Sequence, residues 1–359
     1  MTDNSFWVHP PAIIQWDSTS RCNLHCKHCR ATNLENVERD LTLEEAIRMF
    51  RELNELAPQA TLALAGGEPT MRKDLRNILE FIKENTTISV EMLTNATLIN
   101  KNNIDWLCDL VEGFNISMEG STAEIHDAIR GQGAYKRTIA AVDMLVEKGV
   151  PISIRMTYCG QGENEVKKLM HTIYDHGVKS FNFRYVVPVG NASGALISAE
   201  QHEKIAKLVW IWGKELNMTV GYSDPFPELL VNDERRKEIE ANDKLASGYA
   251  VTGCSVAFSL LYINPNGIVQ FCPYFPVVVD DLKKTPVKEI WYHNEKFNLF
   301  RQSRAFLRGE CGSCKYKFAC GGCRGAAYAS GDYLGSDPRC WRKNINSCNQ
   351  EKRVTGLVG

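Results

Sequence analysis

Residues 21–30 read RCNLHCKHCR and place Cys22, Cys26 and Cys29 in the spacing Cys-x3-Cys-x2-Cys. The stretch directly follows residues 12–17, a short segment with the pattern of a β-strand. Three thiolates this close together can hold three irons of a cubane iron–sulfur cluster and leave the fourth iron without a protein ligand. A zinc knuckle or a group of buried thiols would use the same residues, so the triplet alone leaves both alternatives open.

A second motif lies at the end of the next expected strand. Residues 66–70 read GGEPT and follow the apolar run 61–65. Paired glycines let the backbone approach a ligand closely because they carry no Cβ. A tight turn between a strand and a helix explains the motif equally well when it is taken alone. Chance is a poor explanation for both motifs at the ends of the first two strands of one domain.

Together the two motifs resemble those of the radical S-adenosylmethionine (radical SAM) enzymes. In that family a three-cysteine [4Fe–4S] cluster binds S-adenosylmethionine (SAM) at its open iron, and reductive cleavage of SAM gives a 5′-deoxyadenosyl radical. The resemblance implies that Cys22, Cys26 and Cys29 hold this cluster, and His28 is the aromatic residue before the last cysteine.

The resemblance also implies which residues contact SAM. Glu68 is the charge that can pair with the SAM ammonium, Ser117 would contact the ribose or the carboxylate, and the backbone at Val187 the adenine. Arg155 lies on the polar face of expected strand 152–157, and a buried arginine needs an anion, either the SAM carboxylate or a structural partner. The implied cofactor-binding residues are His28, Gly66, Gly67, Glu68, Pro69, Asn95, Ser117, Arg155 and Val187.

Three further positions stand out beside these motifs. Ala96 follows Asn95 where the family commonly has glycine, which makes a left-handed turn less comfortable. Glu119 replaces the aspartate of the family's Ser-x-Asp-Gly motif. Arg184 shares a polar face with Asn182 on expected strand 180–186, as a functional group or as part of a structural ion pair.

The first half of the chain alternates strands and helices. A helix is expected from Thr42, whose capping box includes Glu45. Repeated βα units give a parallel sheet that curls toward a barrel, with its chemistry at the carboxyl ends of the strands. We therefore expect an α/β fold, a partial (βα)6 TIM-like barrel. The expected strands are residues 12–17, 61–65, 89–94, 114–118, 152–157 and 180–186.

The C-terminal third carries a second set of cysteines, in the pattern Cys-x12-Gly-x4-Cys, a gap, Cys-x2-Cys-x5-Cys-x2-Cys, a gap, and Cys. It resembles the SPASM extension of radical SAM maturases, a β-hairpin plus helices and loops with two auxiliary iron–sulfur clusters. A zinc ribbon remains open for the second group. The resemblance assigns Cys254, Cys272 and Cys323 to a first auxiliary cluster and Cys311, Cys314, Cys320 and Cys340 to a second. Cys348 is a fourth ligand of the first cluster or a bystander.

Composition limits the class of protein. The chain has 359 residues, 44% of them hydrophobic, and a net charge of −1, which gives no sign of a nucleic-acid or anionic membrane partner. The 13 cysteines favour metal binding in a reducing cytoplasm over disulfides, and no signal peptide is visible. The expected domains are the barrel (1–190), a bridging helical region (191–253) and the SPASM domain (254–359).

These expectations describe an oxidoreductase. Radical SAM chemistry takes hydrogen from an unactivated C–H bond, and auxiliary clusters would accept an electron from the substrate. We expect modification of a peptide or small protein by crosslinking, decarboxylation or dehydrogenation; the alternative is oxidation or decarboxylation of a haem precursor or other small metabolite. A non-catalytic iron–sulfur or zinc scaffold is disfavoured by GGEPT. Cys159 is a candidate hydrogen donor, or else a structural thiol.

The expected partners follow from the same chemistry. A reductant such as flavodoxin or ferredoxin would supply the electron that cleaves SAM. Only about 11 residues precede the first expected strand, too few for a leader-binding module. A peptide substrate would therefore call for a separate carrier protein.

Overall fold

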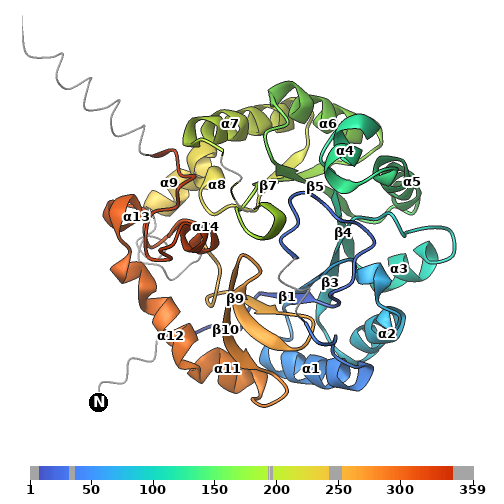
Figure 1. Ribbon diagram of the computed structural model, residues 1–359, viewed down its shortest axis with the longest axis horizontal. Coiled ribbons are helices and arrows are strands. Elements are labelled where there is room, and N and C mark those ends of the chain that lie inside the picture. The colour runs from blue at the N-terminus through green and yellow to red at the C-terminus, as the bar shows by residue number, and fades with distance from the viewer. Residues whose placement is uncertain (1–7, 32–36, 193, 195–196, 242–252, 343–359) are drawn as a thin grey trace, which may run out of the picture.

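The computed structural model describes residues 8–31, 37–192, 194, 197–241 and 253–342. Its centre is one ten-stranded sheet with the strand order β10-β9-β8-β1-β2-β3-β4-β5-β6-β7. Neighbouring strands from β1 to β7 are parallel. The strands line the inside of the molecule, and helices form an outer ring around them (Figure 1). The expected α/β fold with a parallel, barrel-like sheet is confirmed.

The strands are β1 (Ile13–Asp17), β2 (Thr61–Ala65), β3 (Ser89–Thr94), β4 (Gly113–Ser117), β5 (Ile152–Tyr158), β6 (Ser180–Tyr185), β7 (Thr219–Tyr222), β8 (Leu260–Ile263), β9 (Ile268–Cys272) and β10 (Phe275–Asp281). The helices are α1 (Leu43–Leu56), α2 (Leu75–Asn85), α3 (Ile104–Leu110), α4 (Ala123–Arg130), α5 (Ala134–Glu147), α6 (Glu163–Asp175), α7 (Ala199–Glu215), α8 (Pro227–Val231), α9 (Asp233–Ala241), α11 (Val287–His293), α12 (Glu295–Gln302), α13 (Gly309–Ser313) and α14 (Arg324–Ala329). None of the helices within the described ranges has the length and apolarity needed to cross a bilayer.

Side chains alternate along each strand between packing under the helices and facing the interior. In β1, Ile14 and Trp16 are fully buried, and the Trp16 ring lies 5.4 Å from that of Phe50 on α1. Gln15, between them, faces an interior cavity. Polar residues on the inner faces of the strands are thereby brought together although they are far apart in the sequence.

Two local expectations are confirmed. The Glu45 amide donates to Thr42 Oγ1 (3.2 Å), and the Thr42 amide donates to Glu45 Oε2 (2.9 Å), which completes the capping box at the start of α1. Ala96 adopts a left-handed conformation with φ 58° after β3, which costs a non-glycine residue about 1–2 kcal/mol. Its turn is held by a hydrogen bond from the Ala96 amide to Thr94 Oγ1 (2.9 Å).

The sheet extends beyond the six expected strands at both ends. β7 pairs with β6 inside the region expected to be a helical bridge, and its four partly exposed residues lack the apolar run of the other strands. The C-terminal hairpin of β8 and β9 forms as expected, but β8 also pairs in parallel with β1. The cysteine-rich region is therefore continuous with the sheet of the barrel.

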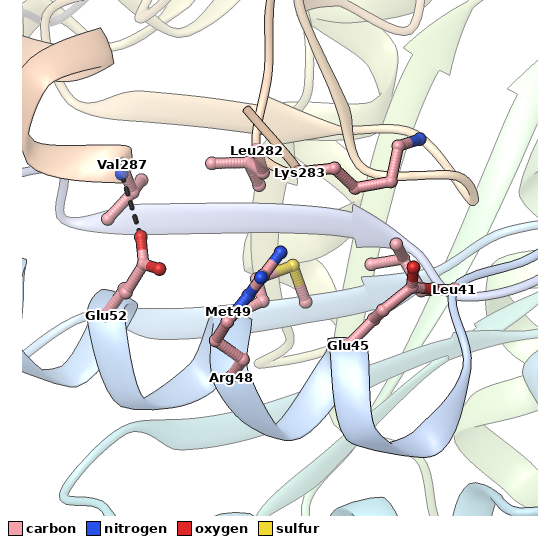
Figure 2. Close-up of a pocket in the computed structure, with 8 residues that line it drawn as sticks. All are labelled: Leu41, Glu45, Arg48, Met49, Glu52, Leu282, Lys283 and Val287. Carbon is pink, nitrogen blue, oxygen red and sulfur yellow. Dashed lines mark hydrogen bonds between the residues drawn. The ribbon is translucent and has the colours of Figure 1, made fainter. Parts of the chain in front are cut away.

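The C-terminal region also packs against α1. Figure 2 shows the small hollow between them, where the Val287 amide donates to Glu52 Oε2 (3.0 Å). Its volume of about 10 Å³ admits roughly one water molecule, so we interpret it as a packing joint. The hollow is lined by Leu41, Glu45, Arg48, Met49, Glu52, Leu282, Lys283 and Val287.

Candidate functional site

A cavity of about 180 Å³ lies at the carboxyl ends of the parallel strands. It is lined by the three N-terminal cysteines and by most of the residues predicted to bind SAM. These residues are Cys22, Cys26, Cys29, His28, Gly66, Gly67, Asn95, Ser117, Arg155 and Val187. Glu68 and Pro69 are buried next to the cavity and do not line it.

The sulfur of each N-terminal cysteine has an N–H donor near it. The Leu24 amide donates to Cys22 Sγ (3.4 Å), and the Ala31 amide donates to Cys29 Sγ (3.3 Å). Arg130 Nη1 lies 3.9 Å from Cys26 Sγ. Hydrogen bonds from N–H groups stabilise anionic sulfur, so this loop suits three metal-bound thiolates.

Without metal the environment favours the neutral thiol. Burial raises the pKa of Cys22 to about 11, and the neighbouring charges of Glu68, Cys26 and Cys29 add to this effect. Burial also raises the pKa of Cys26. A metal must therefore displace protons to bind here, so cluster assembly is expected to be easier at higher pH.

The two glycines of GGEPT fit against the cysteine loop itself. A Cβ on Gly66 would lie 2.7 Å from Thr19 O, and one on Gly67 would lie 2.2 Å from Arg21 O. The Gly67 amide donates to Thr19 O (2.8 Å), and the Glu68 amide donates to Arg21 O (2.8 Å). The absence of Cβ atoms thus lets the first two βα loops pack together beside the cavity.

The Glu68 carboxylate is 1% exposed and accepts four hydrogen bonds. Oε1 accepts from the Thr94 hydroxyl (2.7 Å) and from the amide and hydroxyl of Thr70 (3.2 and 2.7 Å). Oε2 accepts from the Asn95 amide (2.8 Å). Burial raises the pKa of Glu68, and these hydrogen bonds oppose that rise only in part. The side chain thus fastens GGEPT to the end of β3.

We expect Glu68→Gln to lower the free energy of unfolding by about 1–3 kcal/mol, because the amide NH2 would face a donor from Asn95 or Thr94. Chemical unfolding of the reconstituted protein measures this effect, and the exposed Glu44→Gln serves as a control that changes stability by less than about 0.5 kcal/mol. Unchanged stability with a roughly ten- to hundredfold loss of SAM affinity would instead indicate the direct ammonium contact inferred from the sequence.

Glu119 connects the cysteine loop to α4 and β5. Its fully buried carboxylate lies 3.1 Å from His28 Nε2 and 2.5 Å from Arg130 Nη2, and it accepts from the Thr157 amide (2.9 Å). Burial alone would raise the pKa of Glu119, but Arg130 and His28 outweigh it and lower the pKa to about 2. Glu119 stood out in the sequence because it departs from the family motif. Nothing in the sequence indicated the contacts that it makes.

A second buried carboxylate holds the residue that follows the last cysteine of the loop. Arg30 donates to both oxygens of Asp17, at 2.9 Å each, and Tyr262 donates to Asp17 Oδ2 (2.6 Å). Asp17 ends β1, and Tyr262 belongs to β8. The cysteine loop is thereby fixed to β1 and to the start of the C-terminal hairpin.

Two further arginines line the cavity with neutral partners. Arg155 donates to Ser223 Oγ (3.2 Å), and Arg184 donates to the Tyr274 hydroxyl (2.6 Å). Within the described ranges, neither arginine has a carboxylate at ion-pair distance. Burial and the nearby charge of Arg184 lower the pKa of Arg155 to about 10. This part of the cavity therefore favours anionic ligands.

Comparison with known proteins decides the family. A model of the radical SAM superfamily matches residues 16–173, and a model of the SPASM iron–sulfur cluster-binding domain matches residues 254–315. An AdoMet-dependent heme synthase of Methanosarcina barkeri is 30% identical, over 93% of this chain and 97% of that protein. The chain belongs to the radical SAM superfamily. Membership implies SAM and a [4Fe–4S] cluster, and the SPASM match implies auxiliary iron–sulfur clusters.

Other relatives differ in what they make. A pre-heme d1 synthase of Dinoroseobacter shibae is 27% identical, over 92% of this chain and 86% of that protein. A mycofactocin maturase of Mycobacterium ulcerans is 26% identical, over 92% of this chain and 88% of that protein. Streptococcus suis SuiB bound to its precursor peptide SuiA shares the fold, with a TM-score of 0.74 and 19% identity over 90% of this chain and 74% of SuiB.

The C-terminal region of this radical SAM protein contains a second cavity, of about 190 Å³. The amides of Tyr316 and Gly322 donate to Cys314 Sγ and Cys320 Sγ, at 3.4 Å each. Arg342 Nη1 also donates to Cys314 Sγ (2.8 Å). The cysteines that line this cavity are those that the sequence assigned to the second auxiliary cluster: Cys311, Cys314, Cys320 and Cys340.

The cysteines assigned to the first auxiliary cluster are electrostatic neighbours. Burial raises the pKa of Cys272, and the adjacent charges of Cys323 and Cys254 raise it further. The backbone at Tyr274 acts in the opposite direction and lowers this pKa. Cys348, the uncertain fourth ligand, lies outside the described residues. That these three cysteines are ligands of one cluster stays a prediction from the SPASM resemblance.

Two remaining cysteines lie apart from these sites. Cys159 is exposed just beyond β5, and its amide donates to Gln161 Oε1 (2.7 Å). It does not line the cavity that contains most of the residues predicted to bind SAM. Cys108 is partly buried on α3, where it packs against the hydrophobic core. The structure therefore brings neither thiol to a cavity wall.

Proposed function

We propose that this radical SAM enzyme oxidatively decarboxylates the propionate side chains of a tetrapyrrole, a precursor of haem. The observation that carries the proposal is Arg184, a buried cation that lines the cavity next to Arg155 and has no carboxylate partner in the described part of the chain. Tetrapyrrole precursors present several carboxylates on one flat molecule. The similarity to heme synthases over nearly the whole chain supports the same substrate class.

The N-terminal cysteines fit the cofactor that this reaction needs. In the proposal, Cys22, Cys26 and Cys29 hold a [4Fe–4S] cluster, and their N–H donors suit thiolate ligands. When bound, the cluster and SAM supply a radical that takes hydrogen from an unactivated C–H bond.

The protein's own residues position the two ligands. Arg155 pairs in register with Ser117 across β4 and β5, so both can contact the SAM carboxylate on one side of the cavity. The pair of βα loops at Thr19 and Gly67 closes the cavity beside the cysteines and limits access of water to it. Val187, just after β6, also lines the cavity, and in the proposal its backbone contacts the adenine.

The proposed reaction balances as an oxidation. The side chain –CH2–CH2–COO⁻ becomes –CH=CH2, and it releases CO2, one hydrogen atom and one electron. The hydrogen atom goes to the 5′-deoxyadenosyl radical. The electron requires a one-electron acceptor, which the C-terminal cysteine sites would supply: Cys254, Cys272 and Cys323 as one auxiliary cluster, and Cys311, Cys314, Cys320 and Cys340 as the other.

An anaerobic assay tests the proposal. The reconstituted enzyme is incubated with SAM, dithionite and coproporphyrin III, free or with iron, and the products are analysed by mass spectrometry. We expect 5′-deoxyadenosine and a porphyrin that is lighter by one CO2 and two hydrogens for each converted side chain. Formation of 5′-deoxyadenosine without any change in either porphyrin would contradict the substrate class.

A peptide is the second candidate substrate. Its support comes from the similarity to a mycofactocin maturase and from the fold shared with SuiB, which was solved with a precursor peptide bound. A peptide C-terminus or acidic side chain would also satisfy Arg184. Adding a peptide encoded next to this gene to the same assay tests it, and a loss of CO2 or of two hydrogens from the peptide would favour this candidate.

The second C-terminal cavity gives a prediction about electron transfer. We expect Cys311→Ala to remove about one cluster's share of iron and to lower product formation much more than formation of 5′-deoxyadenosine. The reason is that Cys311 lines a cavity separate from the SAM-binding one. Iron content, both products and the unfolding midpoint are measured together, with Cys108→Ala as the control. Equal losses of both products in a folded variant would argue against an electron-accepting role.

A further inference from the structure

Arg184 occupies a buried position in the cavity with spare hydrogen-bonding capacity. It is 7% exposed on β6, opposite Thr157 of β5, and lines the cavity. Its Nη1 donates to the Tyr274 hydroxyl, and its guanidinium carbon lies 4.1 Å from the centre of the Tyr274 ring. Its Nε is buried and has no hydrogen-bond partner among the residues that the structure describes. A buried guanidinium with an unsatisfied N–H favours an anionic ligand.

The other arginines of the cavity show why Arg184 differs. Arg30 and Arg130 each pair with a buried carboxylate, whereas Arg155 and Arg184 contact neutral hydroxyls. Leaving a buried charge without a partner is costly, so the bound state should bring two anions. Burial and the charge of Arg184 lower the pKa of Arg155 to about 10, which agrees with two cations facing one space.

Asp224, a buried carboxylate that the charge of Arg184 affects, already has partners. Asp224 Oδ1 lies 2.8 Å from Arg339 Nη1, and Asp224 Oδ2 accepts from the Tyr185 amide (2.9 Å). The charge of Arg339 lowers the pKa of Asp224, and the charge of Arg184 lowers it further by a smaller amount. No ion pair between Arg184 and Asp224 forms within the described ranges. Asp224 therefore does not neutralise Arg184 by direct contact.

We propose that Arg184, held by Tyr274, binds a carboxylate of the substrate, while Arg155 is left for the carboxylate of SAM. The inference rests on the proposed function, because it takes SAM and a carboxylate-bearing substrate as the ligands. Position separates the two arginines. Arg155 pairs with Ser117 toward β4, whereas Arg184 lies one strand further, against Tyr274 from the C-terminal region.

Tyr274 links this carboxylate site to the first auxiliary cysteines. It follows Cys272 by two residues. A Cβ on Gly325 would lie 2.8 Å from Tyr274 Cβ, so α14 packs closely against it. The guanidinium carbons of Arg184 and Arg30 lie 4.1 and 5.7 Å from the centre of the Tyr274 ring. Two cations over the ring disfavour oxidation of Tyr274. Tyr274 is therefore a positioning residue, and not an electron carrier.

Binding measurements on the anaerobically reconstituted enzyme test the assignment. SAM affinity is read from the cluster spectrum, and coproporphyrin III affinity from the porphyrin spectrum with SAM present. We expect Arg184→Gln to weaken porphyrin binding roughly ten- to hundredfold and to leave SAM affinity within about twofold. Arg155→Gln should do the reverse. Arg184→Lys should rescue only part of the affinity, because lysine lacks the planar fork.

Two more variants separate positioning from folding. Tyr274→Phe removes the hydroxyl that holds Arg184 and should weaken porphyrin binding by a smaller factor, with its iron content unchanged. Arg76→Gln, on the exposed face of α2, is the matched control and should change neither affinity. The tetramethyl ester of coproporphyrin, which lacks the carboxylates, should bind wild type and Arg184→Gln equally weakly.

A smaller probe keeps this inference separate from the proposed function. Sodium propionate binding, measured by saturation-transfer NMR with saturating SAM, should be visible for the wild type and lost in Arg184→Gln. If propionate binds in this way but coproporphyrin does not, the tetrapyrrole proposal is wrong and the Arg184 site stands. The Arg184 site is overturned if the wild type shows no propionate signal or if Arg184→Gln keeps that signal. It is also overturned if Arg184→Gln loses SAM affinity to the extent expected of Arg155→Gln.

Discussion

Simultaneous replacement of Cys22, Cys26 and Cys29 by alanine is expected to abolish SAM cleavage. The reconstituted variant should also lose about a third of its iron if three cubane clusters are present in the wild type. The physical reason is that the three sulfurs line the same cavity as the predicted SAM contacts, and no other cysteine in the described part of the chain lines it. Anaerobic reconstitution followed by iron determination and quantification of 5′-deoxyadenosine measures both effects.

The matched control for this experiment is Cys108→Ala. Cys108 packs against the core from α3 and lines neither cysteine cavity. It should keep its iron and its SAM cleavage, so any general effect of losing a thiol is separated from loss of the cluster. Persistent SAM cleavage in the triple variant would mean that the cluster assignment is wrong.

The parts of the fold that could be predicted are those fixed by local patterns. The six expected strands were visible, several of them as short apolar or β-branched runs, and the capping box at Thr42 marked the start of α1. Spacing set apart the first three cysteines, and the resemblance divided the others. The cysteines that line each of the two cavities are those that had been grouped together. Each of these patterns is formed by residues that lie close together in the sequence, which is why it could be recognised without the structure.

Long-range pairing could not be read in the same way. Nothing in the four residues of β7 distinguishes them from a loop, and β8 gives no sign that it pairs with β1. Arg184 and Tyr274 are 90 positions apart, so only the folded chain brings them together. The sequence marked Arg184 as part of a polar face without indicating its partner.

Glu68 has hydrogen-bond partners that its motif did not indicate. The resemblance predicts that its carboxylate pairs with the SAM ammonium, and it gave no sign of the donors at the end of β3. In the structure the amide of Asn95 and the hydroxyl of Thr94 donate hydrogen bonds to that carboxylate. Gly66 and Gly67 of GGEPT line the cavity, and the SAM contact of Glu68 stays a prediction.

Glu119→Gln is expected to have the largest effect on stability among single substitutions near the cavity. Glu119 is fully buried, so its removal leaves Arg130 as a buried cation without a carboxylate and also weakens the contact to His28. Breaking one partner of a buried ion pair costs about 3–5 kcal/mol. Chemical unfolding under anaerobic conditions measures the loss, and Glu91→Gln, an exposed carboxylate on β3, should change stability by less than about 0.5 kcal/mol.

A second change distinguishes loss of the pair from loss of packing. The double variant Glu119→Gln, Arg130→Met no longer contains the uncompensated cation. We expect it to regain part of the lost stability, because buried ion pairs can often be replaced by neutral groups of similar size. The iron of the N-terminal cluster should still be lower than in the wild type, because Arg130 also lies 3.9 Å from Cys26 Sγ. If Glu119→Gln alone is as stable as the wild type, Arg130 has found another anion, and the Cys26 sulfur is the nearest candidate.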